Sequence, residues 1–184
     1  MEMRFAKLRS SLAALVLVVT IIGAASALHA FQNPKLVIYK SQRRLEVHEG
    51  KVIAKSYPIV LGFDPNGTKT KQGDGKTPEG DYLLVVKNPN SAFYRSIGLN
   101  YPAKPDAVRG LKDGLIDAKQ KKSIDQAANA GRLPPQNTQL GGEIFIHGGG
   151  IGWDWTRGCI ALKNEDMKEL YEGLPEGTPV SILP

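Results

Sequence analysis

The amino-acid sequence predicts a mainly β domain, a β-sandwich or barrel with a few short helices, and two observations support this. Short apolar-rich runs bounded by glycine, proline and asparagine recur from residue 36 onward, which is typical of strands joined by turns. The 184 residues match one typical domain, and the 20 glycines and 12 prolines among them allow many turns. The hydrophobic fraction of 41% and the charged fraction of 23% argue against a disordered chain and a multi-span membrane protein.

Polar turns and loops separate the expected strands. In chain order, the expected strands are residues 36–40, 45–49, 52–61, 82–86, 96–101, 143–147 and 180–183. A glycine- and lysine-rich loop is expected at 62–75 and a second loop at 88–91, where Asn-Pro-Asn-Ser interrupts the strand pattern. The Thr-Pro-Glu-Gly sequence at 77–80 places proline where a turn needs a φ of about −65°.

Two segments have helical patterning. A helix is expected over 112–130, and a break within it stays open because its apolar positions follow the helical period imperfectly. A shorter helix is expected to begin with Asn164 as its N-cap, whose side chain would accept a hydrogen bond from an amide of the first turn. Met167, Leu170 and Tyr171 would form the apolar face of this second helix.

Residues 1–30 have the pattern of an export signal. Basic residues near the amino terminus precede an apolar segment, 12–27, and Ala25 and Ala27 are small residues at the positions that signal peptidase requires. The apolar segment is intermediate between a signal-peptide core of about 7–15 residues and a spanning helix of about 20. A cleaved signal peptide and an uncleaved membrane anchor therefore both fit. We expect export to the periplasm or cell envelope, followed by one catalytic domain over 34–184.

Charge and cysteine content narrow the possible partners. The formal net charge of +6 suits an anionic envelope polymer, but no stripe of lysine and arginine is interleaved with aromatic residues, so no nucleic-acid partner is expected. The chain has one cysteine, which rules out an internal disulfide and a cysteine-rich zinc site. No metal and no cofactor are expected.

The segment 144–162 contains the residues best suited to chemistry. A predicted strand leads to His147 and a glycine-rich loop, and the chain returns through two tryptophans to Cys159. The ordinary alternative is a buried, inert cysteine. An exported chain with one unpaired thiol, however, is exposed to oxidation unless the thiol has a use. The neighbouring Arg157 and a nearby imidazolium would favour the thiolate, so we expect a thiol pKa below about 8.5.

This pattern resembles the catalytic domain of the L,D-transpeptidases of the YkuD type. The family signature is His-Gly after a strand, a variable loop, and Ser/Thr-His-Gly-Cys followed by an apolar run. The matching positions are His147, Gly148, Thr156, Gly158, Cys159 and the apolar run 160–162. The resemblance also includes the turn at 77–80 and covers about residues 34–183. Arg157 stands where most members have histidine, and the loop before Cys159 is shorter than in many members. This form resembles a branch that includes peptidoglycan hydrolases as well as transferases.

The resemblance implies a cysteine acyltransferase that acts on peptidoglycan stem peptides. Cys159 would attack a peptide carbonyl, and His147 would take the thiol proton. The Gly148 carbonyl would orient His147, with Asp154 as an alternative, while the amides of Gly158 and Cys159 would hold the oxyanion with Arg157 nearby. The residues expected to bind substrate are Trp153, Trp155, Thr156 and Tyr101.

The acyl acceptor stays open at this point. An amine acceptor, including one on an envelope protein or tether, gives transfer, whereas water gives hydrolysis on the same fold. A third reading is a non-catalytic envelope-binding domain. The sequence leaves the oligomeric state open.

Overall fold

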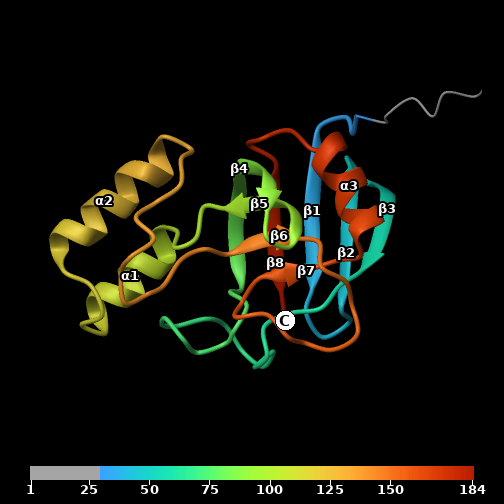
Figure 1. Ribbon diagram of the computed structural model, residues 1–184. Helices are drawn as coiled ribbons and strands as arrows, with labels where there is room; N and C mark the ends of the chain where they lie inside the picture. Colours follow the sequence, from blue (N-terminus) through green and yellow to red (C-terminus); the bar gives the residue numbers. More distant parts are fainter. Residues whose placement is uncertain (1–29) are drawn as a thin grey trace, which may run out of the picture.

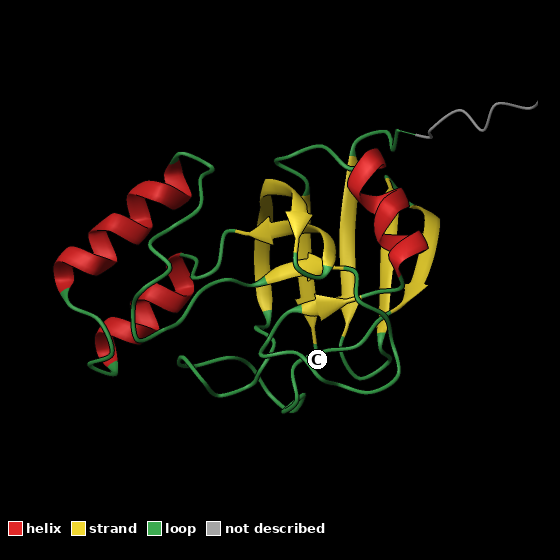
Figure 2. Ribbon diagram, in the orientation of Figure 1, coloured by secondary structure: helices red, strands yellow, loops and turns green. Residues whose placement is uncertain are grey.

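The computed structural model describes residues 30–184, so the predicted export segment, residues 1–30, lies outside the described residues except for Ala30. The described chain is mainly β, as predicted, with an eight-stranded mixed sheet and three short helices (Figures 1 and 2). The strands are β1 (Pro34–Tyr39), β2 (Arg44–Glu49), β3 (Val52–Pro58), β4 (Gly80–Ser91), β5 (Tyr94–Leu99), β6 (Phe145–His147), β7 (Ile160–Ala161) and β8 (Pro179–Leu183). The helices are α1 (Lys104–Lys112), α2 (Ala118–Asn129) and α3 (Asn164–Gly173).

The strand order, β3-β2-β1-β8-β4-β5-β6-β7, places the last strand in the middle of the sheet. Strand β8 pairs in parallel with β1 and antiparallel with β4, and β6 and β7 form the other parallel pair. Beyond β3, Val60 pairs with Ala161 and Gly62 pairs with Thr156. Residues 60–62 follow the edge strand β3, and these bridges pair them with β7 and the segment before it, at the opposite edge. The sheet therefore closes partly on itself, as a sandwich or barrel requires.

The main core lies between the halves of this curved sheet. Alternate residues of β1 and β2 are fully buried, as expected for strands with one face inside. Helix α3 packs against β5 and β6, and the Lys55–Glu169 ion pair, 2.8 Å long, ties it to β3. Met167 and Leu170 are fully buried and Tyr171 is partly buried, which confirms the predicted apolar face. Among residues 30–184, no helix is both long and apolar enough to cross a bilayer.

The predicted helix over 112–130 is shorter than expected, because residues 113–117 form the connection between α1 and α2. Helix α2 occupies its second part, and Asp117 caps it together with Gln120 in a capping box. Helix α1 was not predicted, because Pro105 suggests a break, yet proline is well tolerated in the first turn of a helix. Figure 1 shows α1 and α2 beside the sheet, on the opposite side of the molecule from α3. They enclose a small second core of Ala107, Ile116, Ile124 and Leu140.

Two further local predictions are wrong. Residues 88–91, expected to be a loop, belong to β4, which continues past Asn88 and turns directly into β5 as a hairpin. Asn164 is not the N-cap of α3, because the cap residue is Lys163. The Asn164 side chain accepts a hydrogen bond from Gly149 N at 2.8 Å, so it holds the glycine-rich loop after β6.

Candidate active site

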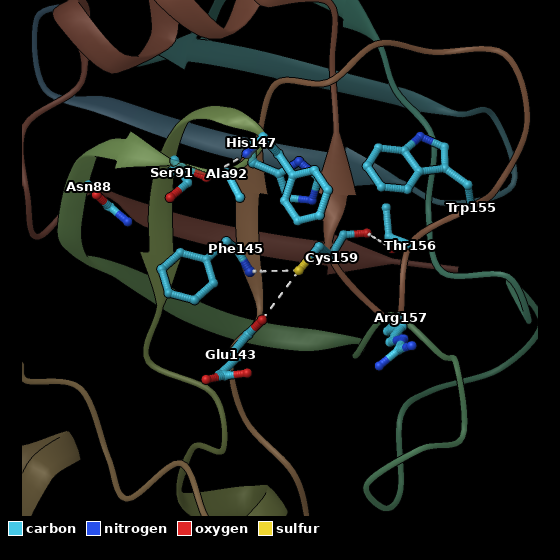
Figure 3. Close-up of a pocket in the computed structure, with 12 residues that line it drawn as sticks. Asn88, Ser91, Ala92, Glu143, Phe145, His147, Trp155, Thr156, Arg157 and Cys159 are labelled. Atoms are coloured by element: carbon cyan, nitrogen blue, oxygen red, sulfur yellow. Dashed lines mark hydrogen bonds between the residues drawn. The ribbon is translucent and has the colours of Figure 1, made fainter.

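The parallel pairing of β6 and β7 brings His147 and Cys159 to one place. Ile146 lies opposite Ile160 and His147 lies opposite Ala161, so Cys159, directly before β7, lies beside Phe145 at the start of β6, two positions before His147. The intervening loop folds back, as the glycines at both of its ends allow. Figure 3 shows the two side chains at one cavity.

His147 is buried and held in one orientation. Its Nδ1 lies 2.6 Å from the Gly148 carbonyl oxygen, the predicted contact. Because a carbonyl can only accept, the ring proton lies on Nδ1 and the Nε2 lone pair is available as a base. Burial lowers the pKa of His147, and the hydrogen bond to Gly148 partly opposes this shift, so the ring is neutral at pH 7. Asp154, the alternative orienter, binds Arg43 at 2.6 Å and Leu61 N at 2.8 Å instead.

The Cys159 thiol is half-buried and protonated. Its Sγ donates to the Glu143 carbonyl oxygen at 3.2 Å and accepts from Phe145 N at 3.5 Å. Within the described part of the chain, Cys159 Sγ and the His147 ring form no hydrogen bond with each other. The predicted low thiol pKa is wrong: burial raises the pKa of Cys159 to about 11, the Phe145 hydrogen bond opposes this, and the Glu143 charge adds to it. The resting site is therefore a neutral thiol beside a neutral base.

The turn before Cys159 depends on glycine. Gly158 has a φ of +124°, and a Cβ there would lie 2.7 Å from the Lys76 carbonyl oxygen, so a side chain is excluded. Gly158 N donates to the Thr156 hydroxyl at 3.1 Å, and that hydroxyl donates to the Cys159 carbonyl at 2.8 Å. The Gly158 amide thus already has an acceptor, and its expected role in holding the oxyanion stays a prediction. Thr156, predicted to bind substrate, stabilises this turn with its hydroxyl.

Two cavities meet at Cys159. The first, of about 580 Å³, contains His147 and has largely apolar walls that include Ser91, Phe93, Phe145 and Trp155. The second, of about 420 Å³, is more polar and includes Lys69, Gln72 and Gln136. Glu143, Arg157 and Cys159 line both. A thiol at such a junction can face one ligand from each side.

Two cations line this junction, Arg157 in both cavities and Lys69 in the second. Arg157 is exposed, and it forms no ion pair with any residue in the described range. Lys69 lies in the predicted glycine- and lysine-rich loop, yet it is 2% exposed, and its ammonium pairs with Asp74 at 2.9 Å. Burial alone would raise the pKa of Asp74, but hydrogen bonds from Lys69 and backbone amides lower it to about 2. No pattern in the sequence marks this lysine as buried.

The three predicted aromatic substrate contacts have different positions. Trp155 lines the first cavity, and its Nε1 donates to the Gly150 carbonyl at 3.3 Å. Trp153 is 70% exposed and lies outside the lining of either cavity at Cys159. The prediction for Tyr101 is wrong, because the residue is fully buried and its hydroxyl donates to the Leu140 carbonyl at 3.0 Å. Tyr101 therefore fixes the helical insertion to the sheet and cannot reach a substrate.

Sequence reasoning missed the contribution of the β4–β5 hairpin. Asn88, Ser91, Ala92 and Phe93 all line the first cavity. The run of asparagine, proline and serine predicts only a loop, and the pairing of β5 with β6 places this hairpin at the site.

Comparisons with known proteins agree with this geometry. YafK of Escherichia coli K12, which carries an L,D-transpeptidase name, is 24% identical over 141 residues, covering 73% of this chain and 44% of YafK. The similarly named YkuD of Bacillus licheniformis is 26% identical over 167 residues, covering 88% of this chain and 76% of YkuD.

Solved structures share the fold. The helical cell shape determining protein Pgp2 of Campylobacter jejuni matches with a TM-score of 0.56 and 25% identity, covering 81% of this chain and 46% of Pgp2. Bd1075 of Bdellovibrio bacteriovorus has a TM-score of 0.50 and 22% identity, covering 83% of this chain and 48% of Bd1075, a likeness of fold alone. This chain thus spans less than half the length of YafK and Pgp2. The model of the L,D-transpeptidase catalytic domain (YkuD) matches residues 33–182, and the chain belongs to this family.

Proposed function

We propose that the chain is a peptidoglycan L,D-transpeptidase that transfers an acyl group through a thioester on Cys159. The observation that carries the proposal is one thiol at the meeting point of two cavities, beside a buried histidine whose Nε2 is available as a base. Two cavities suit a reaction with two successive ligands, an acyl donor and an acyl acceptor. Membership of the family supports stem peptides as the substrate class.

The first half of the reaction forms the thioester. The thiol turns from the Glu143 carbonyl to His147, Nε2 takes its proton, and Sγ attacks the carbonyl carbon of the donor peptide. The oxygen of the tetrahedral intermediate carries the negative charge. The Cys159 amide and the Arg157 guanidinium are the candidate groups to stabilise it. The C–N bond then breaks, and the leaving amine takes the proton from Nε2.

The second half of the reaction breaks the thioester. An acceptor amine loses a proton to Nε2 and attacks the thioester carbonyl, the C–S bond breaks, and the proton returns to the thiol. With water in place of the amine the same steps release a carboxylic acid, so the acceptor alone separates a transpeptidase from a hydrolase. The neutral His147 suits both halves, because a base must be unprotonated before each attack.

The cellular context is part of the same proposal. The predicted export segment would deliver the domain to the periplasm or cell envelope, where its substrate lies. The name of Pgp2 links that protein to helical cell shape, and the likeness supports a role in cell shape for this chain. An envelope protein with an exposed amine is a further acceptor that the chemistry permits.

Mass spectrometry of purified peptidoglycan fragments incubated with the protein tests the proposal. New cross-linked fragments that appear with the wild type and not with Cys159→Ala are the expected result. Shortened fragments without cross-links would identify a hydrolase. Unchanged fragments, together with protein that sediments with the cell wall, would overturn the proposal in favour of a binding domain.

A further inference from the structure

The tip of the β4–β5 hairpin lies directly against His147. The Phe93 ring stacks on the imidazole with ring centroids 4.9 Å apart and an interplanar angle of 28°. Trp155 meets the same imidazole edge-on, at 5.5 Å and 62°, and also contacts Phe93 at 5.3 Å. The imidazole is therefore fixed by one hydrogen bond at Nδ1 and by two aromatic rings.

The Phe93 side chain is accessible to solvent. It is 47% exposed and lines the first cavity, although a phenylalanine with a purely structural role would be buried in the core. Stacking of one aromatic ring on another stabilises their relative orientation beyond what buried area alone provides, so the Phe93 ring favours one orientation of the imidazole.

The backbone around Phe93 keeps the ring in this position. Phe93 N donates to Ser91 Oγ at 3.2 Å, and Gly148 N donates to the Arg95 carbonyl at 3.2 Å. A Cβ on Gly148 would lie 3.1 Å from the Phe93 carbonyl oxygen and 2.9 Å from the Tyr94 Cβ. The hairpin tip and the segment after β6 are thus in direct contact, and a small shift of either would move the imidazole.

We propose that Phe93 is a positioning residue that holds His147 with Nε2 facing the first cavity and shields the ring from water. The expected effect of Phe93 on the reaction rate rests on the proposed function. The expected effect of Phe93 on the orientation and titration of the His147 imidazole is independent of that function.

Several titratable and charged groups near the imidazole also influence the titration of His147. Cys159, Arg157 and Glu143 line the same cavity as His147. The Arg95 guanidinium, on the adjacent strand, is paired with Glu172 at 2.6 Å. None of these groups changes when Phe93 is replaced, so a change in the titration of His147 would report the loss of the ring.

The test compares Phe93→Ala with Tyr94→Ala in the full chain. Both variants remove one aromatic ring from the same turn, but the Tyr94 ring faces Arg95, with its centroid 5.7 Å from the guanidinium carbon. The readouts are the pH titration of the His147 ring by NMR, assigned by comparison with His147→Asn, and kcat and KM for transfer. We expect Phe93→Ala to raise the His147 pKa toward its ordinary value and to lower kcat about 10- to 100-fold with little change in KM. We expect Tyr94→Ala to leave both unchanged.

A conservative variant separates positioning from folding. Phe93→Trp keeps a stacking ring and should restore kcat, whereas Phe93→Leu keeps apolar bulk without stacking and should not. An unchanged His147 titration and kcat in Phe93→Ala would overturn the proposal, and so would equal effects in Tyr94→Ala. If the wild type transfers no acyl group, the proposed function fails, while the His147 titration still decides whether Phe93 shields the ring.

Discussion

The protonated state of Cys159 has a measurable consequence in its reactivity toward alkylating reagents. Burial raises the thiol pKa from an ordinary 9.0 to about 11. At pH 7 an ordinary thiol is about 1% thiolate, and a thiol of pKa about 11 is about 0.01% thiolate. Since the thiolate is the reactive form, alkylation at pH 7 should be about 100-fold slower than for an ordinary cysteine. The rate should keep rising through pH 9 to 10.

The assay is the rate of iodoacetamide labelling between pH 6 and 11, with circular dichroism to confirm that the fold persists. The midpoint of the pH profile, rather than the absolute rate, reports the pKa, because limited access slows labelling at every pH. Glu143→Gln removes the negative charge that raises the thiol pKa, so it should shift the midpoint downward while the backbone contact to Sγ remains. Fast labelling with a midpoint below about 8.5 would refute the neutral pair.

Three further predictions concern the structure around the site. Gly158→Ala places a side chain in a left-handed conformation against a backbone oxygen, so the free energy of unfolding should fall by about 1–3 kcal/mol, measured by urea denaturation, and transfer should be lost. Asp74→Asn leaves the buried Lys69 ammonium without its carboxylate and should cost about 3–5 kcal/mol. Because the folded pKa of Asp74 is depressed, the stability it provides is present above pH 3.8 and lost as pH falls toward 2, and this loss should be absent in Asp74→Asn, measured by acid denaturation. Tyr101→Phe removes one buried hydrogen bond to Leu140 and should lower the unfolding free energy by about 1 kcal/mol without changing KM, and a raised KM would restore a substrate contact.

The elements that the sequence predicts well are those whose signal is local. Alternating apolar residues identify β1 and β2, and the period of Met167 and Leu170 identifies α3. The motif around His147 and Cys159 likewise lies within a single stretch, and a β strand on each side suffices to predict the return of the loop.

The parts that sequence reasoning missed depend on distant contacts. No local pattern in the sequence marks Tyr101 as buried, and only the packing of the helical insertion shows it. The high thiol pKa arises mainly from burial, and the Glu143 charge adds to it; both depend on how the chain folds around Cys159. Phe93 reaches His147 through the pairing of β5 with β6, which no local pattern encodes.

The intact mass of the protein after incubation with a stem tetrapeptide donor tests the central claim most directly. The account predicts that the wild type gains the mass of the donor acyl group, with peptide mapping placing it on Cys159. Cys159→Ala should gain none, and His147→Ala should form the adduct at least about 100-fold more slowly, because the thiol has lost its base. A wild type that forms no adduct, or an adduct that persists in Cys159→Ala, would contradict the account.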